Sequence, residues 1–208
     1  MRLILASASP RRADLLRSAG YDFETVTAEV DESPLAGETP EAYVARLATE
    51  KARAALRMLD RLGRGSGPGG PLEPPHAPVV LAADTTVVVD GLILGKPASE
   101  DDAVGMLRRL SGRPHVVLTG VALVQGSAWT LDVASTTVWM APVSERDIRW
   151  YVATGEPFGK AGAYAIQGLA SRFVERVDGS YSNVVGLPVA LVHRRLLELA
   201  AESAQPRR

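Results

Sequence analysis

Residues 79–94 read Val-Val-Leu-Ala-Ala-Asp-Thr-Thr-Val-Val-Val-Asp-Gly-Leu-Ile-Leu. The apolar run over residues 79–83 predicts a buried strand that ends at Asp84. Asp90-Gly91, between two further apolar runs, predicts a β-hairpin. Open α/β sheets bind ligands just outside the carboxyl ends of their strands, so Asp84 is a candidate site residue. The alternative is that Asp84 only caps the turn that follows.

The regions on both sides of this stretch mix helix and strand signals without strict alternation. Capping residues and apolar spacing predict helices at residues 10–20, 40–62, 99–112, 144–155 and 187–201. Runs of apolar and β-branched residues predict strands at residues 2–6, 23–28, 115–124, 129–140 and 173–177. We therefore expect an α/β fold with a mixed sheet and flanking helices, formed by a single domain over residues 1–208.

Residues 63–78 are rich in glycine and proline, and we expect no regular structure there. The segment is interpreted as a flexible loop or an insertion, with a domain boundary as the less favoured alternative. It contains no lysine and follows no apolar strand, which excludes a phosphate-cradling loop.

Composition limits the classes of function. The 208 residues have a formal net charge of −1 and include no cysteine. This charge gives no sign of a nucleic-acid or anionic-membrane partner, and the lack of cysteine excludes disulfides, thiolate catalysis and Cys-ligated metals. The three histidines are scattered without ligand spacing. No apolar run is long enough to span a bilayer or to form a signal peptide, so we expect a soluble cytoplasmic protein.

Of the 23 Lys and Arg residues, three are Lys, namely Lys51, Lys96 and Lys160. Arg and Lys are not interchangeable in packed sites, so these three are candidates for function. Lys51 falls within the apolar stripe of the helix predicted at 40–62. The stripe consists of Val44, Leu47, Ala48, Ala55, Met58, Leu59 and Leu62. A desolvated ammonium needs an anionic partner. Two interpretations stay open: Lys51 snorkels or pairs with a carboxylate, or it binds a ligand phosphate.

Arg11 and Arg12 lie in the first turn of the helix predicted after Ser9. Cations at a helix N-terminus oppose the macrodipole by about 0.3–1 kcal/mol each, and a bound anion reverses that sign. Two solvated arginines are the alternative. Lys96 lies between Gly95 and Pro97, and this short motif lacks the remaining parts of a P-loop.

Glu32 and Asp84 are carboxylates with no His or Cys close in sequence, a donor set that suits Mg²⁺ or Mn²⁺. Mg²⁺ in particular is usually held by one or two carboxylates together with substrate phosphates. With the lysines and the arginine pair, these carboxylates predict a phosphate-binding site with a divalent cation. The residues alone predict no more specific chemistry.

Several blocks together resemble one known family. They are Ser7-Ala8-Ser9-Pro10-Arg11-Arg12, Asp31-Glu32, Leu47-Ala48 with Lys51-Ala52, Ala83-Asp84-Thr85, Gly95-Lys96-Pro97, Leu110-Ser111-Gly112 with His115 and Thr119-Gly120, Lys160-Ala161-Gly162-Ala163-Tyr164 with Ile166-Gln167-Gly168, and Ser182-Asn183-Val184-Val185-Gly186-Leu187-Pro188. In this order they resemble the Maf family of nucleoside triphosphate pyrophosphatases, once described as septum formation inhibitors. The resemblance implies an elongated fold similar to that of the inosine triphosphatases, with two lobes around a cleft.

The resemblance also implies roles for individual residues. Asp84 is implied as the proton acceptor, and Glu32 with Asp84 as the ligands of a divalent cation, Mg²⁺ or Mn²⁺. The implied substrate-binding residues are Ser7, Arg12, Lys51, Lys96 and Lys160. Arg11, Thr85 and Gln167 match positions linked to base selection in the branch that hydrolyses dTTP and UTP, with modified pyrimidine nucleotides as further candidates. Gly159 stands where the family usually has Asp, and the segment 63–78 is longer than usual.

Two other functions stay open at this stage. One is a nucleotide-binding regulator of cell division or septum formation with weak hydrolysis, and the other is nucleotidyl transfer, which needs a second substrate. The expected partner is a nucleoside triphosphate, with no nucleic acid and no membrane. A homodimer remains open.

Overall fold

Strand β5 (Val79–Val89) lies in the middle of the sheet and runs through Asp84 without a break. The sequence analysis placed the end of this strand at Asp84, and that prediction is wrong. Asp84 is in register with Gly120 of the neighbouring strand β7 (Pro114–Gln125). The long antiparallel pairing with β7 holds the polar residues in extended backbone, which a local apolar pattern does not reveal.

The computed structural model describes residues 1–27, 29–63, 66–67, 70–71 and 77–204. Its main sheet has the strand order β2-β1-β5-β7-β8-β9, and β6 pairs with the far end of β5. The other bounds are β1 (Leu3–Ala6), β2 (Glu24–Thr25), β6 (Leu92–Leu94), β8 (Ala128–Met140) and β9 (Val174–Asp178). Strand β1 runs parallel to β2 and β5, whereas the other pairs are antiparallel, so the predicted mixed sheet is confirmed.

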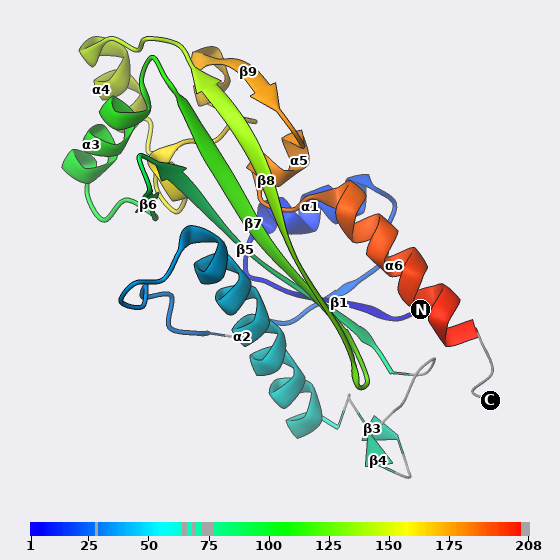
Figure 1. Ribbon diagram of the computed structural model, residues 1–208. Helices are drawn as coiled ribbons and strands as arrows, with labels where there is room; N and C mark the ends of the chain where they lie inside the picture. Colours follow the sequence, from blue (N-terminus) through cyan, green and yellow to red (C-terminus); the bar gives the residue numbers. More distant parts are fainter. Residues whose placement is uncertain (28, 64–65, 68–69, 72–76, 205–208) are drawn as a thin grey trace.

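The molecule is elongated because three of its strands are long. Strand β8 has 13 residues, and at about 3.3 Å per residue it spans roughly 43 Å. Figure 1 shows β5, β7 and β8 crossing the whole molecule as twisted ribbons. The predicted hairpin after β5 is confirmed, with Asp90 and Gly91 at φ values of 53° and 74° in its turn.

The first four helices begin directly after the predicted capping residues Ser9, Thr39, Ser99 and Ser144, whereas the C-terminal helix begins at Val189, two residues later than predicted. Their bounds are α1 (Pro10–Ser18), α2 (Pro40–Arg61), α3 (Glu100–Leu110), α4 (Glu145–Ala153), α5 (Tyr181–Val185) and α6 (Val189–Ala204), with 3-10 helices η1 (Ala161–Ala163) and η2 (Leu169–Phe173). The hydroxyls of Thr39, Ser99 and Ser144 each accept a backbone hydrogen bond in the first turn that follows. The sequence analysis did not predict α5.

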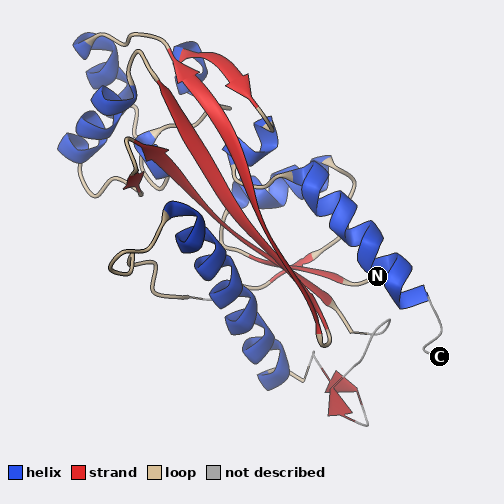
Figure 2. Ribbon diagram, viewed as in Figure 1, coloured by secondary structure: helices blue, strands red, loops and turns tan. Residues whose placement is uncertain are grey.

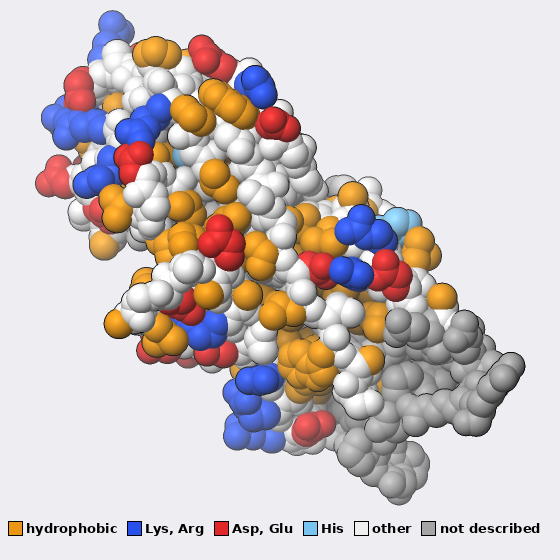
Figure 3. Space-filling model, viewed as in Figure 1, with side chains coloured by type: hydrophobic (Ala, Val, Ile, Leu, Met, Phe, Trp, Pro, Cys, Tyr) orange, Lys and Arg blue, Asp and Glu red, His pale blue; other side chains and the backbone are white. Residues whose placement is uncertain are grey.

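Two lobes with separate hydrophobic cores share the long strands. In one lobe, α2 covers one face of the sheet, while α1 and α6 cover the other (Figures 1 and 2). Residues alternate along β5 between these faces: Val79 and Leu81 pack toward α1 and α6, and Val80 and Ala82 toward α2. The second lobe packs α3, α4, η1 and η2 around the far ends of β5, β7 and β8. Lys and Arg side chains are interspersed with Asp and Glu over both lobes on the face in Figure 3.

Part of the predicted 63–78 loop lies outside the described residues, namely 64–65, 68–69 and 72–76. Between these gaps, β3 (Ser66–Gly67) and β4 (Gly70–Pro71) form a short antiparallel pair. The expectation of no regular structure is therefore wrong for these four positions. In the part of the chain that the structure describes, no helix combines the length and the apolar character needed to cross a membrane.

Helix α2 lies directly against the backbone of β7 at Gly120. A Cβ atom added at Gly120 would be 2.2 Å from the carbonyl oxygen of Val44, a distance that no side chain can tolerate. The predicted apolar stripe of α2 is buried at its centre, but Met58 and Leu62, at 43% and 58% exposure, are not part of the buried face. Gly120 therefore sets how closely α2 approaches the sheet.

We expect Gly120→Ala to lower the free energy of unfolding by about 1–3 kcal/mol, the range for overpacking a core. The matched control is Gly105→Ala in α3, where an added Cβ would have no atom within 4 Å. That change should raise stability by up to about 1 kcal/mol, because Ala is the better helix former. Urea unfolding of both variants measures the difference, and equal stabilities would contradict the close approach.

Candidate active site

A gap along one edge of β5 opens a cleft between the two lobes. On that edge β1 pairs with residues 79–82 and β6 with residues 87–89, so in the described part of the chain no strand covers residues 83–86. The cleft formed there has a volume of about 1020 Å³. It lies beyond the carboxyl end of β1, not of β5 as the sequence analysis expected.

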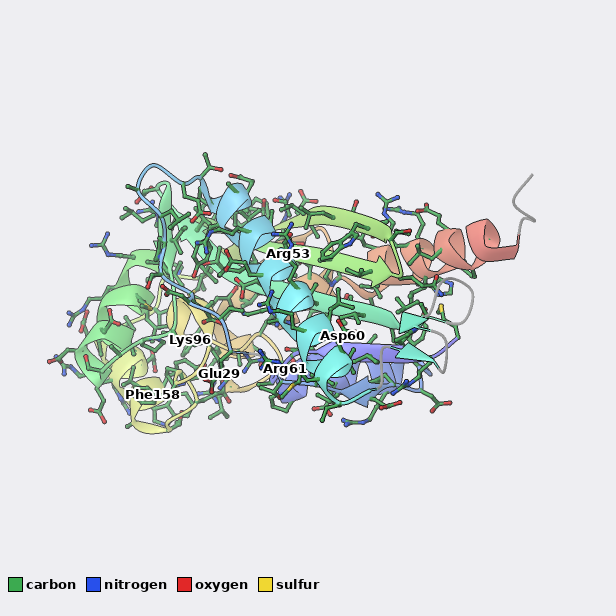
Figure 4. The ribbon with its side chains drawn as sticks, turned by 90° about the horizontal axis from the view of Figure 1, so that it is seen from below. Glu29, Arg53, Asp60, Arg61, Lys96 and Phe158 are labelled. Carbon is green, nitrogen blue, oxygen red and sulfur yellow. The ribbon has the colours of Figure 1, made fainter. Side chains whose placement is uncertain are left out.

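All of the predicted site residues line this one cleft. They are Ser7, Arg11, Arg12, Glu32, Lys51, Asp84, Thr85, Lys96, Lys160 and Gln167. Because consecutive residues of a strand face opposite sides, Asp84 points toward α2 and Thr85 toward α1. In the view of Figure 4, Lys96 and Glu29, which both line the cleft, lie between α2 and the loop that carries Phe158. Arg53, Asp60 and Arg61 lie along the exposed side of α2.

Lys51 joins the two carboxylates of the cleft. Its Nζ atom lies 2.5 Å from Oδ1 of Asp84 and 2.7 Å from Oε1 of Glu32. The other oxygen of Glu32 accepts from Lys96 at 2.9 Å. Of the two interpretations of Lys51, the structure shows pairing with carboxylates. The carboxylates concerned are the same two that were predicted to hold a metal ion.

These two carboxylates have pKa values shifted in opposite directions. Burial raises the pKa of Asp84, and attraction to Lys51 and Arg12 only partly offsets the effect. Burial also acts to raise the pKa of Glu32, but hydrogen bonds from Lys51 and Lys96 outweigh it and lower the value to about 2. Two titratable groups whose environments separate their pKa values are typical of an acid–base pair with distinct roles. Asp84 is the better proton acceptor, while Glu32 stays ionised.

Arg12 is buried and uses most of its donors on the protein itself. Nε donates to the carbonyl of Gly186 at 2.7 Å, and Nη1 to the Ser7 hydroxyl and the Ala83 carbonyl at 3.1 and 2.8 Å. Nη2 donates to the Thr85 hydroxyl at 2.9 Å. A guanidinium has five N–H donors, so little remains for a ligand. The contacts tie α1 to the open edge of β5, and they position Thr85.

Lys160 and Gln167 lie on the segment before and after η1. The Nζ atom of Lys160 donates to the backbone carbonyls of Glu156 and Phe158 at 2.5 and 3.4 Å. Burial lowers the pKa of Lys160, and the nearby charge of Arg11 adds to this effect. Burial likewise lowers the pKa of Arg11. Gln167 is exposed at the cleft.

Sequence reasoning assigned no role to two residues that support the cleft, Tyr43 and Thr119. Tyr43 lines it and donates its hydroxyl proton to the carbonyl of Glu32 at 2.8 Å, which holds the acidic loop. Tyr43 lies on the same helical face as Lys51, so a hydroxyl among apolar residues was an available signal. Thr119 bonds Thr85 across β5 and β7 at 2.9 Å. A threonine within a strand carries no such signal.

The donor chemistry fits a divalent cation that is shared with a substrate. Among the described residues, no cluster of three or more His, Cys, Asp or Glu could form a complete protein cage. Glu32 and Asp84 offer oxygen ligands side by side, with Lys51 placed between them as a positive charge. A hard cation held by these two carboxylates and by phosphate oxygens matches the usual pattern for Mg²⁺.

A cleft with paired carboxylates and surrounding cations is typical of proteins that bind phosphorylated ligands. The family model described as Maf-like protein matches residues 2–199, and the chain belongs to the Maf family. Two curated relatives named dTTP/UTP pyrophosphatase are each 49% identical to this chain. The relative from Shewanella denitrificans aligns over 99% of this chain and 98% of its own length. The relative from Symbiobacterium thermophilum aligns over 90% of this chain and 89% of its own length. The Staphylococcus aureus Ham1 protein aligns over 68% of this chain and 72% of its own, with 15% identity and a TM-score of 0.44, too low a likeness to add to the description of the fold.

We expect Lys51→Met to destabilise the fold by about 3 kcal/mol, because it leaves the Asp84 carboxylate buried without its counter-ion. Adding Asp84→Asn should recover most of the loss, since no charge is then left unpaired. Urea unfolding in the presence of EDTA provides the double-mutant cycle. Lys96→Met is the control: this side chain is 59% exposed, so a change within about 0.5 kcal/mol is expected. Additive effects of the two cleft substitutions would contradict the pairing.

A second expectation concerns Glu32 and pH. A folded-state pKa of about 2, below the ordinary value of about 4.3, means that ionised Glu32 stabilises the fold above about pH 5. The side chain is 40% exposed, so screening limits this to about 1 kcal/mol. The stability difference between the protein and Glu32→Gln should shrink as pH falls from about 5 to 2. Urea unfolding of both proteins across that pH range measures the difference. A stability difference that grew on acidification would contradict the lowered pKa of Glu32.

Proposed function

We propose that this protein is a nucleoside triphosphate pyrophosphatase that hydrolyses dTTP and UTP to the monophosphate and pyrophosphate. The observation that carries the proposal is the pair of carboxylates with opposite pKa shifts, joined by Lys51 within a cleft lined by two further lysines. The name dTTP/UTP pyrophosphatase, shared by curated relatives over nearly the whole chain, supports the choice of reaction and substrate. Modified pyrimidine nucleotides are further candidate substrates.

Asp84 accepts the proton of the water molecule that attacks the α-phosphorus. Its raised pKa brings a carboxylate closer to the range in which a base is effective at neutral pH. A divalent cation, held by Glu32 and Asp84, would supply charge stabilisation to the phosphate oxygens when bound. Glu32 suits that role because its lowered pKa keeps it ionised.

Lys51 and Lys96 bind the triphosphate. Hydrogen bonds to Glu32 and Asp84 hold both ammonium groups at defined positions in the cleft. When a triphosphate arrives, its oxygens offer these lysines new anionic partners. The lysines then stabilise the negative charge that builds up on the departing pyrophosphate.

Arg11, Thr85 and Gln167 recognise the base. Arg12 positions these residues, because it donates hydrogen bonds to the hydroxyl of Thr85 and to the carbonyl of Gly186. We assign Arg12 mainly this supporting role, with a minor direct contact to phosphate through its remaining donor. Ser7, which bonds both Arg12 and the backbone of Ser9, belongs to the same frame.

The direct test is an assay of dTTP, UTP, CTP and 7-methyl-GTP with Mg²⁺ and with Mn²⁺, scoring pyrophosphate separately from orthophosphate. We expect pyrophosphate from dTTP and UTP, and a loss of at least about 10³-fold in kcat for Asp84→Asn, the range in which removal of an essential proton acceptor falls. The Asn side chain keeps the size of Asp, so the variant should remain folded.

The control for this assay is Asp132→Asn, which removes a carboxylate that pairs with Arg195 outside the cleft. It should leave turnover within a factor of about two, as expected for a change remote from the reaction. Retained turnover in Asp84→Asn would refute the proton acceptor. No pyrophosphate from any nucleotide would refute the proposed function, and would favour a nucleotide-binding regulator.

A further inference from the structure

We propose that Glu156 is a positioning residue for pyrimidine recognition, because it fixes the turn that presents Gln167 to the cleft. The inference rests on the proposed function, in which Gln167 takes part in reading the base. Glu156 does not line the cleft, and it lies just after α4 in the loop that leads to η1. Its carboxylate nevertheless accepts hydrogen bonds from the backbone that follows Gln167 in the chain.

Both oxygens of Glu156 accept hydrogen bonds from the start of η2. Oε2 accepts from the backbone nitrogen of Leu169 at 3.0 Å, and Oε1 from that of Ala170 at 3.4 Å. These two residues follow Gln167 by two and three positions. The carboxylate therefore fixes the backbone on the C-terminal side of the turn.

Tyr151 extends the same connection to the N-terminal side of the turn. Its buried hydroxyl donates to Oε1 of Glu156 at 2.9 Å and accepts from the backbone nitrogen of Ala165 at 3.2 Å. A backbone hydrogen bond of 3.0 Å from Gly168 to Ala165 closes the turn around Gln167. One carboxylate, directly and through one tyrosine, thus holds the chain on both sides of Gln167.

The carboxylate of Glu156 also lies in close contact with Gly168. A Cβ atom added at Gly168 would be 2.4 Å from Oε2 of Glu156. The carboxylate packs directly on the Cα atom of the residue after Gln167, so carboxylate and turn occupy one fixed relative position. Short-range hydrogen bonds to a base need such a fixed frame, because a small displacement of the donor or acceptor removes them.

The charged residues proposed to bind the triphosphate are held by contacts that do not involve the Glu156 side chain. Lys51, Lys96 and Asp84 are held by one another and by Glu32, with no contact to Glu156. Lys160 donates its hydrogen bonds to the backbone carbonyls of Glu156 and Phe158, which a side-chain substitution leaves in place, and the Glu156 carboxylate acts on it only through charge. Loss of the Glu156 carboxylate should therefore affect base recognition more than triphosphate binding. A purely structural role would lower both together.

The experiment compares Glu156→Gln with Glu145→Gln, a control at the start of α4 whose carboxylate pairs with Arg108 on the surface. Gln keeps the size of Glu, but one of its two terminal groups is an NH₂ donor instead of an oxygen acceptor. Because both oxygens of Glu156 accept hydrogen bonds, the Gln side chain loses at least one of them. Four quantities are measured for the full chain: kcat for UTP, KM for UTP, the ratio of kcat/KM for UTP over CTP, and the inhibition constant of pyrophosphate, which has no base.

For Glu156→Gln we expect KM for UTP to rise about tenfold and the UTP-over-CTP ratio to fall about tenfold, a change of about 1.4 kcal/mol. The inhibition constant of pyrophosphate and kcat should stay within about twofold. Glu145→Gln should change none of these quantities by more than about twofold. An unchanged UTP-over-CTP ratio in a folded Glu156→Gln protein, or a parallel loss of pyrophosphate binding, would overturn the proposal.

Two further variants keep the test decisive if Glu156→Gln fails to fold. Tyr151→Phe removes one link, and Gly168→Ala displaces the carboxylate from the opposite side; both should lower the same ratio without weakening pyrophosphate inhibition. The unmodified protein is assayed first. If it releases no pyrophosphate from UTP, the proposed function fails. If it hydrolyses UTP without preference over CTP, or shows the preference and all three variants keep it, the role of Glu156 fails while the proposed function stands.

Discussion

The structure depends on one buried charge, the carboxylate of Asp84 in the middle of β5. A carboxylate placed there without a partner would cost several kcal/mol, so a cation has to reach it from outside the sheet. Lys51 does so from α2, and Gly120 allows that helix to lie directly on the backbone of β7. Lys51 also pairs with Glu32, so this one cation links α2, the acidic loop and β5 around the cleft.

The open edge of β5 is the second constraint. Because β1 stops at Ala6 and β6 begins to pair only at Val87, a short piece of β5 presents side chains of both faces to one space. Asp84 on the α2 side meets charged groups, while Thr85 on the α1 side meets Arg12 and Thr119. A single strand thereby contributes to the proposed reaction and to the proposed recognition of the base.

Much of this could be predicted from local signals. The Asp-Gly hairpin, the helix starts and the unusual position of Lys51 on an apolar face are short-range patterns, and the structure confirms them. The course of β5 through Asp84 could not be predicted, because it depends on pairing with β7 some thirty-five residues later. The hydrogen bond from Arg12 to the carbonyl of Gly186 could not be predicted either, because it joins distant parts of the chain. The gathering of all predicted site residues in one cleft was implied by the resemblance, not by their spacing.

The two ends of the cleft rely on different physics. Around Lys51 the groups are charged, and charge attraction acts over several ångströms, so small movements of the triphosphate change binding little. At the Gln167 end, the proposed recognition of the base depends on hydrogen bonds, which weaken steeply with distance and angle. Charge attraction to a triphosphate does not depend on its base, whereas discrimination among bases requires a rigid frame. Glu156, Tyr151 and Gly168 supply that rigidity from outside the cleft, so residues that never touch the nucleotide can determine which base is accepted.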